Sequence, residues 1–537
     1  MVPILPSFQF ERTLNKIRFL GYQISIPVLF FAVLLVIGTA VFRDYGVDVD
    51  ETDNQIYAQC TLEAFSNPFS KQPYSDCSVW KDMSDKNHQI THTPALLASE
   101  LLLERSLGIK TPRQAILLKH VFSFFIFWLA VVSLYFISHR FLSPAYRLLP
   151  SFFLVICPRL FGASFYLYVD VWALSFFIFG ILTLIRFIEK PSRSRFIWHC
   201  IVSGFGLGVR LTGLIVTAIT LGVGVIESIH KKNKRAMPPF RMVLYSASVF
   251  LVLFLIWPLL WSGPIQKLSA AIYSTAAFHK NLHFGPYLYF GQWLKGFSPP
   301  WHYNLISMLL TLPPITILFF GPGVYFSLKT LPRFENILLF TWFFVPLILA
   351  VILKTTLYDG WRHFYFIYPA FALFSAIGFE KVHSKMNQWG ARFLIGLMTV
   401  GLLWTLKFMV VSHPYEGTYY NLFVGGMKGA FGRFPLDERG ISFREGLQRI
   451  AEASKPAGDI LVNVYMYTRL ASDELHLLNP DSLSERVKFV DESKAEFFMT
   501  NLTRTVPINW AQHALVFSID VEGTPILKVY RRTNLQI

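Results

Sequence analysis

The sequence predicts a polytopic α-helical membrane protein with a small α/β domain near its C-terminal end. The 537 residues are 53% hydrophobic and only 15% charged, and their mean hydropathy is +0.44. A soluble domain is typically about one quarter charged. Apolar runs of about 20 residues recur through the first three-quarters of the chain, and each can cross a hydrocarbon layer about 30 Å thick. After Val411 these runs stop and charges of both signs appear.

The apolar runs predict eleven membrane spans. In chain order they cover residues 22–42, 116–138, 148–165, 171–188, 197–211, 212–229, 242–261, 304–328, 336–353, 364–380 and 393–411. The first run is longer than the core of a signal peptide, and no small-residue cleavage pattern follows it. We therefore expect it to remain as the first helix.

The loops between these spans divide into two alternating sets. One set is short and basic and includes KKNKR at 231–235. Such loops face the cytoplasm, which places the N-terminus inside and residues 412–537 outside. The net charge of +16 is spread over these loops instead of forming one patch, so nucleic-acid binding is not indicated.

The tail has the pattern of a folded outer domain. Strand-like segments occur at 459–467, 495–500 and 514–520, and FREGLQRIAEAS at 443–454 is helix-like. We therefore divide the chain into a membrane domain at 1–411, with an outer loop at 43–115, and an α/β domain at 412–537.

Two of the four cysteines, Cys60 and Cys77, lie in the outer loop, whereas Cys157 and Cys200 lie within spans. An oxidising outer compartment allows the first pair to form a disulfide. We predict this Cys60–Cys77 bridge, with two unrelated free thiols as the alternative.

An acidic cluster, YGVDVDETDNQIY at 45–57, follows the first span. A charge run is usually a solvated loop, but Val47 and Ile56 interrupt this one. Asp170 lies at the same membrane face between two spans, where an unpaired charge costs several kcal/mol. Two carboxylates from separate loops suit a general base, or a ligand for a metal or a cationic group.

Several segments, in this order and spacing, resemble the GT-C superfamily of membrane glycosyltransferases, and in particular bacterial proteins related to the protein O-mannosyltransferases (glycosyltransferase family 39). These segments are GVDVDETDNQIYAQ (46–59), THTPALLASELLLERSLGI (91–109), PRLFGASFYLYVDVWALSF (158–176), GVRLTGL (208–214), PPWHYNLISMLLTLPP (299–314), LYDGWRHFYFIYP (357–369) and HPYEGTYYNLFVGG (413–426). The chain departs from the family pattern at Thr52 and Thr93, and at 434–442, where FPLDERGIS replaces an acidic-aromatic run.

The resemblance implies a sugar donor linked to a polyprenyl phosphate, an acceptor that is a protein, glycan or lipid, and transfer with inversion. The outer side is a periplasm or an ER lumen, and the bacterial look-alikes favour a bacterial inner membrane with the active site on the periplasmic side. Asp50 and Glu51 match the family's acid pair, so Asp50 is expected to be the general base. Asp170 is expected to orient the acceptor or hold Asp50, while Asp48 and Asp53 should matter far less for transfer if they only solvate the loop.

The leaving phosphate requires cations, because its charge grows as the glycosidic bond breaks. Arg362, with His363 beside it, is the first candidate for contacting it and Arg210 the second, since a guanidinium can grip phosphate through two hydrogen bonds. The alternative is that both arginines extend to lipid headgroups. His92 and His302 are further candidates, with interfacial packing as their alternative. The sequence leaves the need for a divalent cation open.

Two other functions compete with a glycosyltransferase. A secondary transporter also needs acids among many helices, but transporters show two related halves with broken helices at the midplane. A non-enzymatic scaffold would not explain paired acids near an arginine suited to phosphate. A cavity at the outer face shared by Asp50, Asp170 and Arg362 favours the enzyme, and a midplane channel favours transport.

Overall fold

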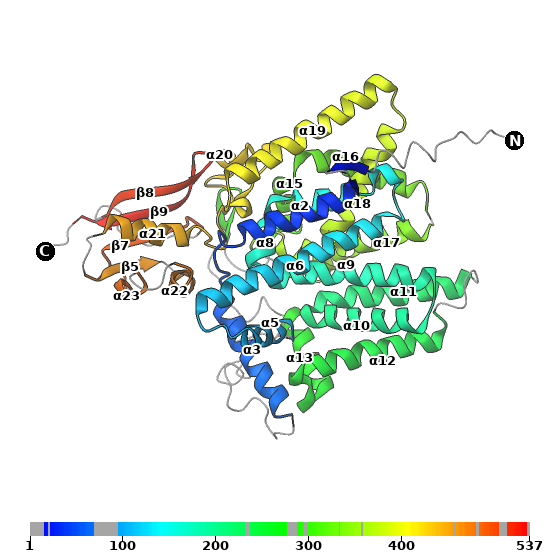
Figure 1. The fold of residues 1–537 in the computed structure, drawn as a ribbon, viewed down its shortest axis with the longest axis horizontal. Helices are drawn as coiled ribbons and strands as arrows, with labels where there is room; N and C mark the ends of the chain where they lie inside the picture. Colours follow the sequence, from blue (N-terminus) through cyan, green and yellow to red (C-terminus); the bar gives the residue numbers. More distant parts are fainter. Residues whose placement is uncertain are drawn as a thin grey trace.

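Helices dominate the chain before residue 412, and a small sheet lies near its end (Figure 1). The computed structural model describes residues 16–19, 22–68, 95–230, 237–276, 287–294, 299–331, 333–355, 358–454, 458–464, 467–478, 483–503 and 513–533. Figure 1 shows the sheet and its helices at one end of the helical bundle.

Within these residues, five helices are long and apolar enough to cross a membrane, so the chain is an integral membrane protein. They are α6 (Pro112–Ser138), α9 (Tyr168–Glu189), α12 (Pro239–Ile256), α17 (Phe334–Ile352) and α19 (Gln388–Val411). Shorter apolar helices are α2 (Ile26–Val41), α16 (Pro314–Leu328) and Leu211–Ile226, which is a short 3₁₀ turn with the first part of α11 (Leu214–His230). The other helices of the bundle are α10 (Arg193–Val209), α15 (Tyr303–Thr311) and α18 (Tyr368–His383). The count of eleven spans stays a prediction.

Two of the predicted spans are each divided into two helices. The segment 148–165 forms α7 (Leu149–Val155) and α8 (Pro158–Tyr166). The helical stretch Pro144–Val155, which ends with α7, is bent by 63° from α8 at the break, and the two would make a sixth span if counted as one. The segment 304–328 divides into α15 and α16 at Pro313. A proline lacks the N–H of the helical ladder and clashes with the preceding turn, so each break falls beside a proline.

The start of the chain also differs from the prediction. Residues 22–42 were expected to form one helix, but strand β2 (Tyr22–Ser25) pairs with β1 (Lys16–Phe19) and the helix starts only at Ile26. Outside the bundle, α3 (Glu51–Ser66) and α5 (Ala95–Ser106) follow the first helix, α13 (Pro264–Ala276) follows α12, and a short hairpin joins β3 (Tyr287–Tyr289) to β4 (Gln292–Leu294).

Close packing of α16 on α18 depends on two glycines. A Cβ atom at Gly323 would lie 1.8 Å from the carbonyl oxygen of Phe374, and one at Gly378 would lie 2.0 Å from that of Phe319. Small residues allow helix backbones in a membrane to approach in this way. This contact fixes the helix that follows the segment carrying Arg362.

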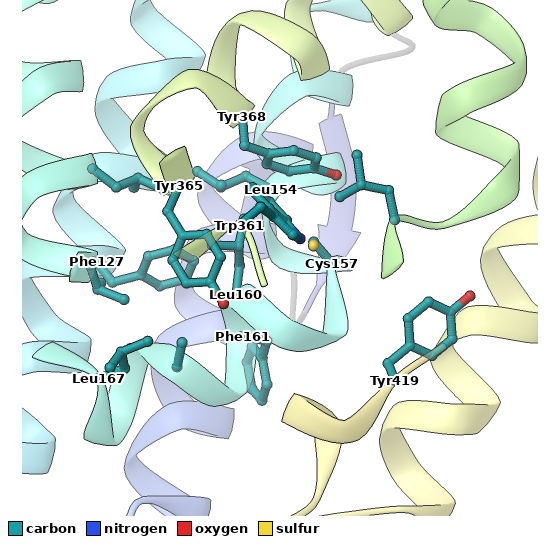
Figure 2. Close-up of a cluster of buried hydrophobic side chains, with 14 of the residues drawn as sticks. Phe127, Leu154, Cys157, Leu160, Phe161, Leu167, Trp361, Tyr365, Tyr368 and Tyr419 are labelled. Atoms are coloured by element: carbon teal, nitrogen blue, oxygen red, sulfur yellow. The ribbon is translucent and has the colours of Figure 1, made fainter. Parts of the chain in front are cut away.

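A buried aromatic cluster anchors that segment (Figure 2). Trp361 donates its indole N–H to Thr311 Oγ1 at 2.8 Å, and Tyr368 donates its hydroxyl to the carbonyl of Phe153 at 3.0 Å. Figure 2 shows Trp361, Tyr365 and Tyr368 beside Leu154, on α7. Trp361 precedes Arg362 in the chain and Tyr368 follows it. Because both side chains are held in the core, the backbone at Arg362 has a defined position.

The C-terminal sheet has the strand order β6-β5-β7-β9-β8. Its strands are β5 (Ile460–Val464), β6 (Val487–Phe489), β7 (Phe497–Thr500), β8 (His513–Val521) and β9 (Thr524–Arg532). β5 runs parallel to β6 and β7, and the β8–β9 hairpin is antiparallel. Three of these strands lie in or across the predicted segments, and α21 (Phe443–Ala453) covers the predicted helix.

This C-terminal part packs directly on the acidic loop. Two acids of helix α22 (Thr468–Leu475) accept hydrogen bonds from this loop. Glu474 Oε1 accepts the N–H of Val47 at 2.8 Å, and Asp473 Oδ2 accepts the hydroxyl of Thr52 at 2.7 Å. The remaining helix of the tail is α23 (Leu483–Arg486). The acidic loop therefore lies between the helical bundle and the C-terminal sheet.

The predicted topology can be tested with reporter fusions. We expect a fusion after residue 411 to report the outer side and a fusion between α11 and α12 to report the cytoplasm, because the short basic loops stay inside. The second fusion is the internal control. Reporter signals that place the C-terminus in the cytoplasm would overturn the orientation.

Candidate active site

Arg439 gathers three acids from two distant loops. Its Nη2 donates to Asp48 and, at 3.2 Å, to Asp50 Oδ2, while its Nη1 donates to Asp359 Oδ2 at 3.1 Å. Asp50 directly precedes α3, and Asp359 directly precedes a glycine with positive φ, Gly360, so both lie at turns. The Asp50 side chain is 54% exposed, whereas those of Asp48 and Arg439 are buried.

Asp170 holds two arginines at the same place. It lies in the first turn of α9 with only 1% of its side chain exposed. Arg362 Nη1 donates to Asp170 Oδ2 at 2.9 Å, and Arg210 Nη1 contacts the other carboxylate oxygen. Arg362 Nε also lies 3.3 Å from Asp359 Oδ2, which joins this pair to the cluster around Arg439.

The structure therefore brings four predicted residues into one ion network: Asp50, Asp170, Arg210 and Arg362. Sequence reasoning missed Arg439 and Asp359 as members. Asp359 lies in the segment LYDGWRHFYFIYP, and Arg439 lies in FPLDERGIS, the segment that departs from the resembled family. The resemblance at the first segment and the departure at the second were the features of the sequence that could have pointed to Asp359 and Arg439.

The condition that Asp48 only solvates the loop is not met. Its side chain is buried against Arg439. Burial, and then the nearby Asp50, raise the pKa of the Asp48 carboxyl to about 7, although Arg439 opposes both effects. Asp53 behaves as expected, because it forms a half-exposed pair with Arg469 at 2.8 Å.

Glu51 points away from the Arg439 cluster. It accepts the hydroxyl of Tyr168 at 2.9 Å and pairs with Lys119, which is buried and also donates to Gln55 at 3.1 Å. The two carboxylates of the predicted acid pair thus have different partners, and the catalytic role of Glu51 stays a prediction.

The histidines have separate surroundings. The ring of His363 lies against Tyr358 at 4.8 Å. Burial, and then the neighbouring Arg362 and Arg210, lower the pKa of His363, so it is neutral at pH 7. His302 Nδ1 is hydrogen-bonded to the hydroxyl of Tyr289 at 2.8 Å. The structure thus places His302 in an aromatic contact, while His363 lies beside the ion network.

Two of the predicted residues, His92 and Cys77, lie outside the described residues. Cys60 is disulfide-bonded, and Cys157 and Cys200 are buried free thiols. The pairing of Cys60 with Cys77 stays a prediction.

Residues of the ion network line one cavity, and a second cavity lies beside the helix that carries Tyr303. The first, of about 30 Å³, is lined by Arg159, Arg362 and Arg439, among others. The second and larger one, of about 480 Å³, has a mostly apolar wall that includes Trp301, Asn304, Leu305, Leu347, Val351 and Lys354. Asn304 on this wall is the chain neighbour of Tyr303, and the hydroxyl of Tyr303 accepts the N–H of Gly360 at 3.1 Å. This hydrogen bond connects the helix beside the large cavity to the loop that carries Asp359.

No group of three or more His, Cys, Asp or Glu side chains is arranged to hold a metal ion in the part of the chain that the structure describes. The acids of the network face arginine instead.

Comparison with known proteins gave structural likenesses only. No protein-family model and no curated protein matches the chain. Among solved structures, ArnT from Cupriavidus metallidurans bound to undecaprenyl phosphate is 12% identical, with a TM-score of 0.49 over 94% of this chain and 97% of that chain. The apo oligosaccharyltransferase of Archaeoglobus fulgidus is 12% identical, with a TM-score of 0.44 over 87% of this chain and 65% of that one.

A second structure from that archaeon, the oligosaccharyltransferase AglB with an inhibitory peptide and a dolichol-phosphate, is 11% identical. Its TM-score is 0.45, over 95% of this chain and 75% of that chain. Because all these TM-scores lie below 0.5, the function proposed below rests on the site's own residues.

Proposed function

We propose that the chain is a GT-C-type glycosyltransferase that moves a sugar from a polyprenyl-phosphate donor to an acceptor hydroxyl, with inversion. The observation that carries this proposal is the single ion network, in which an exposed carboxylate, Asp50, lies beside buried arginines. The proposed setting is the outer face of a bacterial inner membrane, with a protein, glycan or lipid as the acceptor.

Asp50 has the surroundings of a general base. It is the exposed acid of the network, so an acceptor can reach it, and Arg439 holds it from one side. As the acceptor oxygen bonds to the anomeric carbon, its proton passes to the Asp50 carboxylate. The bond from that carbon to the phosphate oxygen breaks at the same time, and the electron pair leaves with the phosphate.

Arg362 supports the second half of the reaction. Its guanidinium is buried and oriented by Asp170, so it can meet the developing charge of the leaving phosphate without rearranging. Asp170 is doubly paired and nearly inaccessible, which suits a residue that positions Arg362 better than one that removes a proton.

The large cavity suits the lipid part of such a donor. Its wall is mainly apolar, and Lys354 is the charged residue on it. A polyprenyl chain needs apolar surface close to the cations that hold its phosphate. The contact from Tyr303 to Gly360 links the two parts.

The location of the network favours a transferase over a transporter. Its members lie at helix ends: Asp50 precedes α3, Asp170 is in the first turn of α9, Arg210 ends α10, and Arg362 starts a 3₁₀ helix before α18. A transport site lies near the bilayer midplane instead.

The test is release of polyprenyl phosphate by the purified chain in detergent, with a panel of synthetic polyprenyl-phosphate sugars and acceptors. We expect turnover with one donor, and we expect Arg362→Lys to lower it by about tenfold or more, because lysine keeps the charge but loses the two-pronged geometry. The exposed Arg449→Gln is the matched control. Absence of turnover with every donor, together with solute uptake into vesicles, would favour the transporter.

A further inference from the structure

Arg439 lies in a stretch of the chain without helix or strand. Helix α20 (Gly426–Ala430) ends before this stretch, and α21 begins after it, at Phe443. The hydrogen-bond ladder of a helix or sheet therefore does not fix the backbone that carries Arg439. Contacts from side chains are needed to keep this arginine against the acids of the ion network.

Asp437, two residues before Arg439, closes the turn that carries it. The Asp437 carboxylate accepts the backbone N–H groups of Ile441 and Ser442, each at 3.0 Å. Aspartate often stabilises a turn in this way, by bonding to backbone groups a few residues further on. Gly440 adopts a φ of +67° within the turn, a conformation that glycine tolerates without strain. The position of Arg439 thus depends on where the backbone of Asp437 is held.

The C-terminal sheet holds that backbone through Asn501. This residue directly follows β7, and its Nδ2 donates to the carbonyl of Asp437 at 2.8 Å. Thr503 Oγ1 donates to Asn501 Oδ1, also at 2.8 Å, so both ends of the amide are engaged and its orientation is fixed. Asn501 and Asp437 are both buried. A side chain from the sheet therefore fixes the chain two residues away from Arg439.

The backbone after Asn501 is strained. Leu502 has a φ of +61°, in the left-handed region that residues other than glycine rarely occupy. Such strain persists only where surrounding contacts impose it, and it clusters at functional sites. Asn501, Leu502 and Thr503 also match the pattern of an N-glycosylation acceptor. The amide is buried and hydrogen-bonded in the folded protein, so this turn serves an internal contact instead.

The same part of the chain also holds the loop of acids that Arg439 meets. Glu474 of α22 is fully buried and accepts the N–H of Val47, the residue before Asp48. A Cβ atom at Gly46 would lie 2.3 Å from Glu474 Oε1, so the loop approaches this helix closely. The C-terminal part thus contacts both sides of the pairing between Arg439 and the acidic loop.

We propose that Asn501 is a positioning residue for sugar transfer, which holds the turn at Asp437 so that Arg439 stays against Asp50 and Asp359. Asn501 acts through Arg439 and not on the substrate. The contact from Arg439 Nη2 to Asp50 Oδ2 is 3.2 Å long, so a small shift of the turn removes it as a hydrogen bond. This assignment rests on the proposed function for the reaction that Arg439 and Asp50 serve.

The experiment is a double-variant cycle with Asn501→Ala and Arg439→Lys in the purified full chain in detergent. Lysine keeps the buried charge but cannot bridge Asp50 and Asp359 with two nitrogens. The matched control is Asn463→Ala, because Asn463 Nδ2 also donates to a backbone carbonyl of the C-terminal part, that of Val490, at 2.8 Å. Both kcat with the donor panel and the midpoint of thermal unfolding are measured for every variant.

We expect Asn501→Ala to lower kcat by about three- to tenfold, whereas Asn463→Ala should change it by less than about twofold. In the Arg439→Lys background, Asn501→Ala should lower kcat by less than about twofold, because the bridge that it positions is already lost. Equal losses in both backgrounds, or equal effects of the two asparagine changes, would make Asn501 a merely stabilising residue and overturn the assignment.

A milder pair of variants covers the case in which Asn501→Ala does not fold. Thr503→Val removes the hydroxyl that orients the Asn501 amide and should lower kcat, and Thr503→Ser should recover that loss. Loss of kcat in both Thr503 variants, or in neither, would contradict the assignment.

The unfolding midpoints separate this assignment from the proposed function. If the wild type transfers no sugar, non-additive midpoints for Asn501→Ala with Arg439→Lys, and additive ones for Asn463→Ala, would sustain the placement of Arg439 and contradict the proposed function alone. Additive midpoints for both asparagines would then overturn both proposals.

Discussion

Asp50→Asn is expected to lower the rate of sugar transfer by about 10²–10⁴-fold, the usual loss when a positioned general base is removed. Asparagine keeps the size of the side chain, and its Oδ1 can still accept the hydrogen bond from Arg439. Only the basicity disappears. The loss should therefore appear in kcat at saturating donor, with an unfolding midpoint close to that of the wild type.

Two neighbouring acids provide the controls for Asp50. Asp53→Asn removes a half-exposed pair with Arg469, and such pairs contribute at most about 1 kcal/mol, so turnover should stay near wild type. Asp48→Asn should instead lower stability, because the buried Arg439 loses a buried partner. Near wild-type turnover by Asp50→Asn would place the base elsewhere.

Asp170→Asn is expected to destabilise the protein by about 3–5 kcal/mol, the typical cost of removing one partner from a buried ion pair. The carboxylate of Asp170 is almost fully buried and carries both Arg362 and Arg210. An amide removes the counter-charge that these two guanidinium groups share, and Arg362 keeps only its contact with Asp359. Denaturant unfolding of purified variants in detergent measures the loss.

A double-variant cycle separates this ion pair from general disruption. Asp170→Asn combined with Arg362→Gln should cost less than the sum of the two single changes, because the second change removes one of the two charges that have lost Asp170 as their partner. Strict additivity, or a loss below about 1 kcal/mol for Asp170→Asn alone, would mean that the pair does not stabilise the fold.

Much of the helical architecture could be predicted from the sequence, because the bilayer restricts the alternatives. Backbone groups in hydrocarbon must bond within their own segment, so an apolar run of sufficient length becomes a helix. The segments at 116–138 and 393–411 became α6 and α19 for this reason. The segments at 148–165 and 304–328 were taken as single spans, although Pro158 and Pro313 indicate where their helices divide.

The sequence by itself determined the apolar helices, the strand segments of the tail and the acids at helix ends, because each depends on neighbouring residues. The tertiary structure alone decided which cation each acid meets. Arg439 and Asp50 are 389 positions apart, and Lys119 and Glu51 are 68 apart. Such contacts depend on how the bundle and the C-terminal sheet pack together, which no local pattern encodes. For the same reason Asp48 became a buried partner of Arg439, while Asp53, five residues away, stayed at the surface.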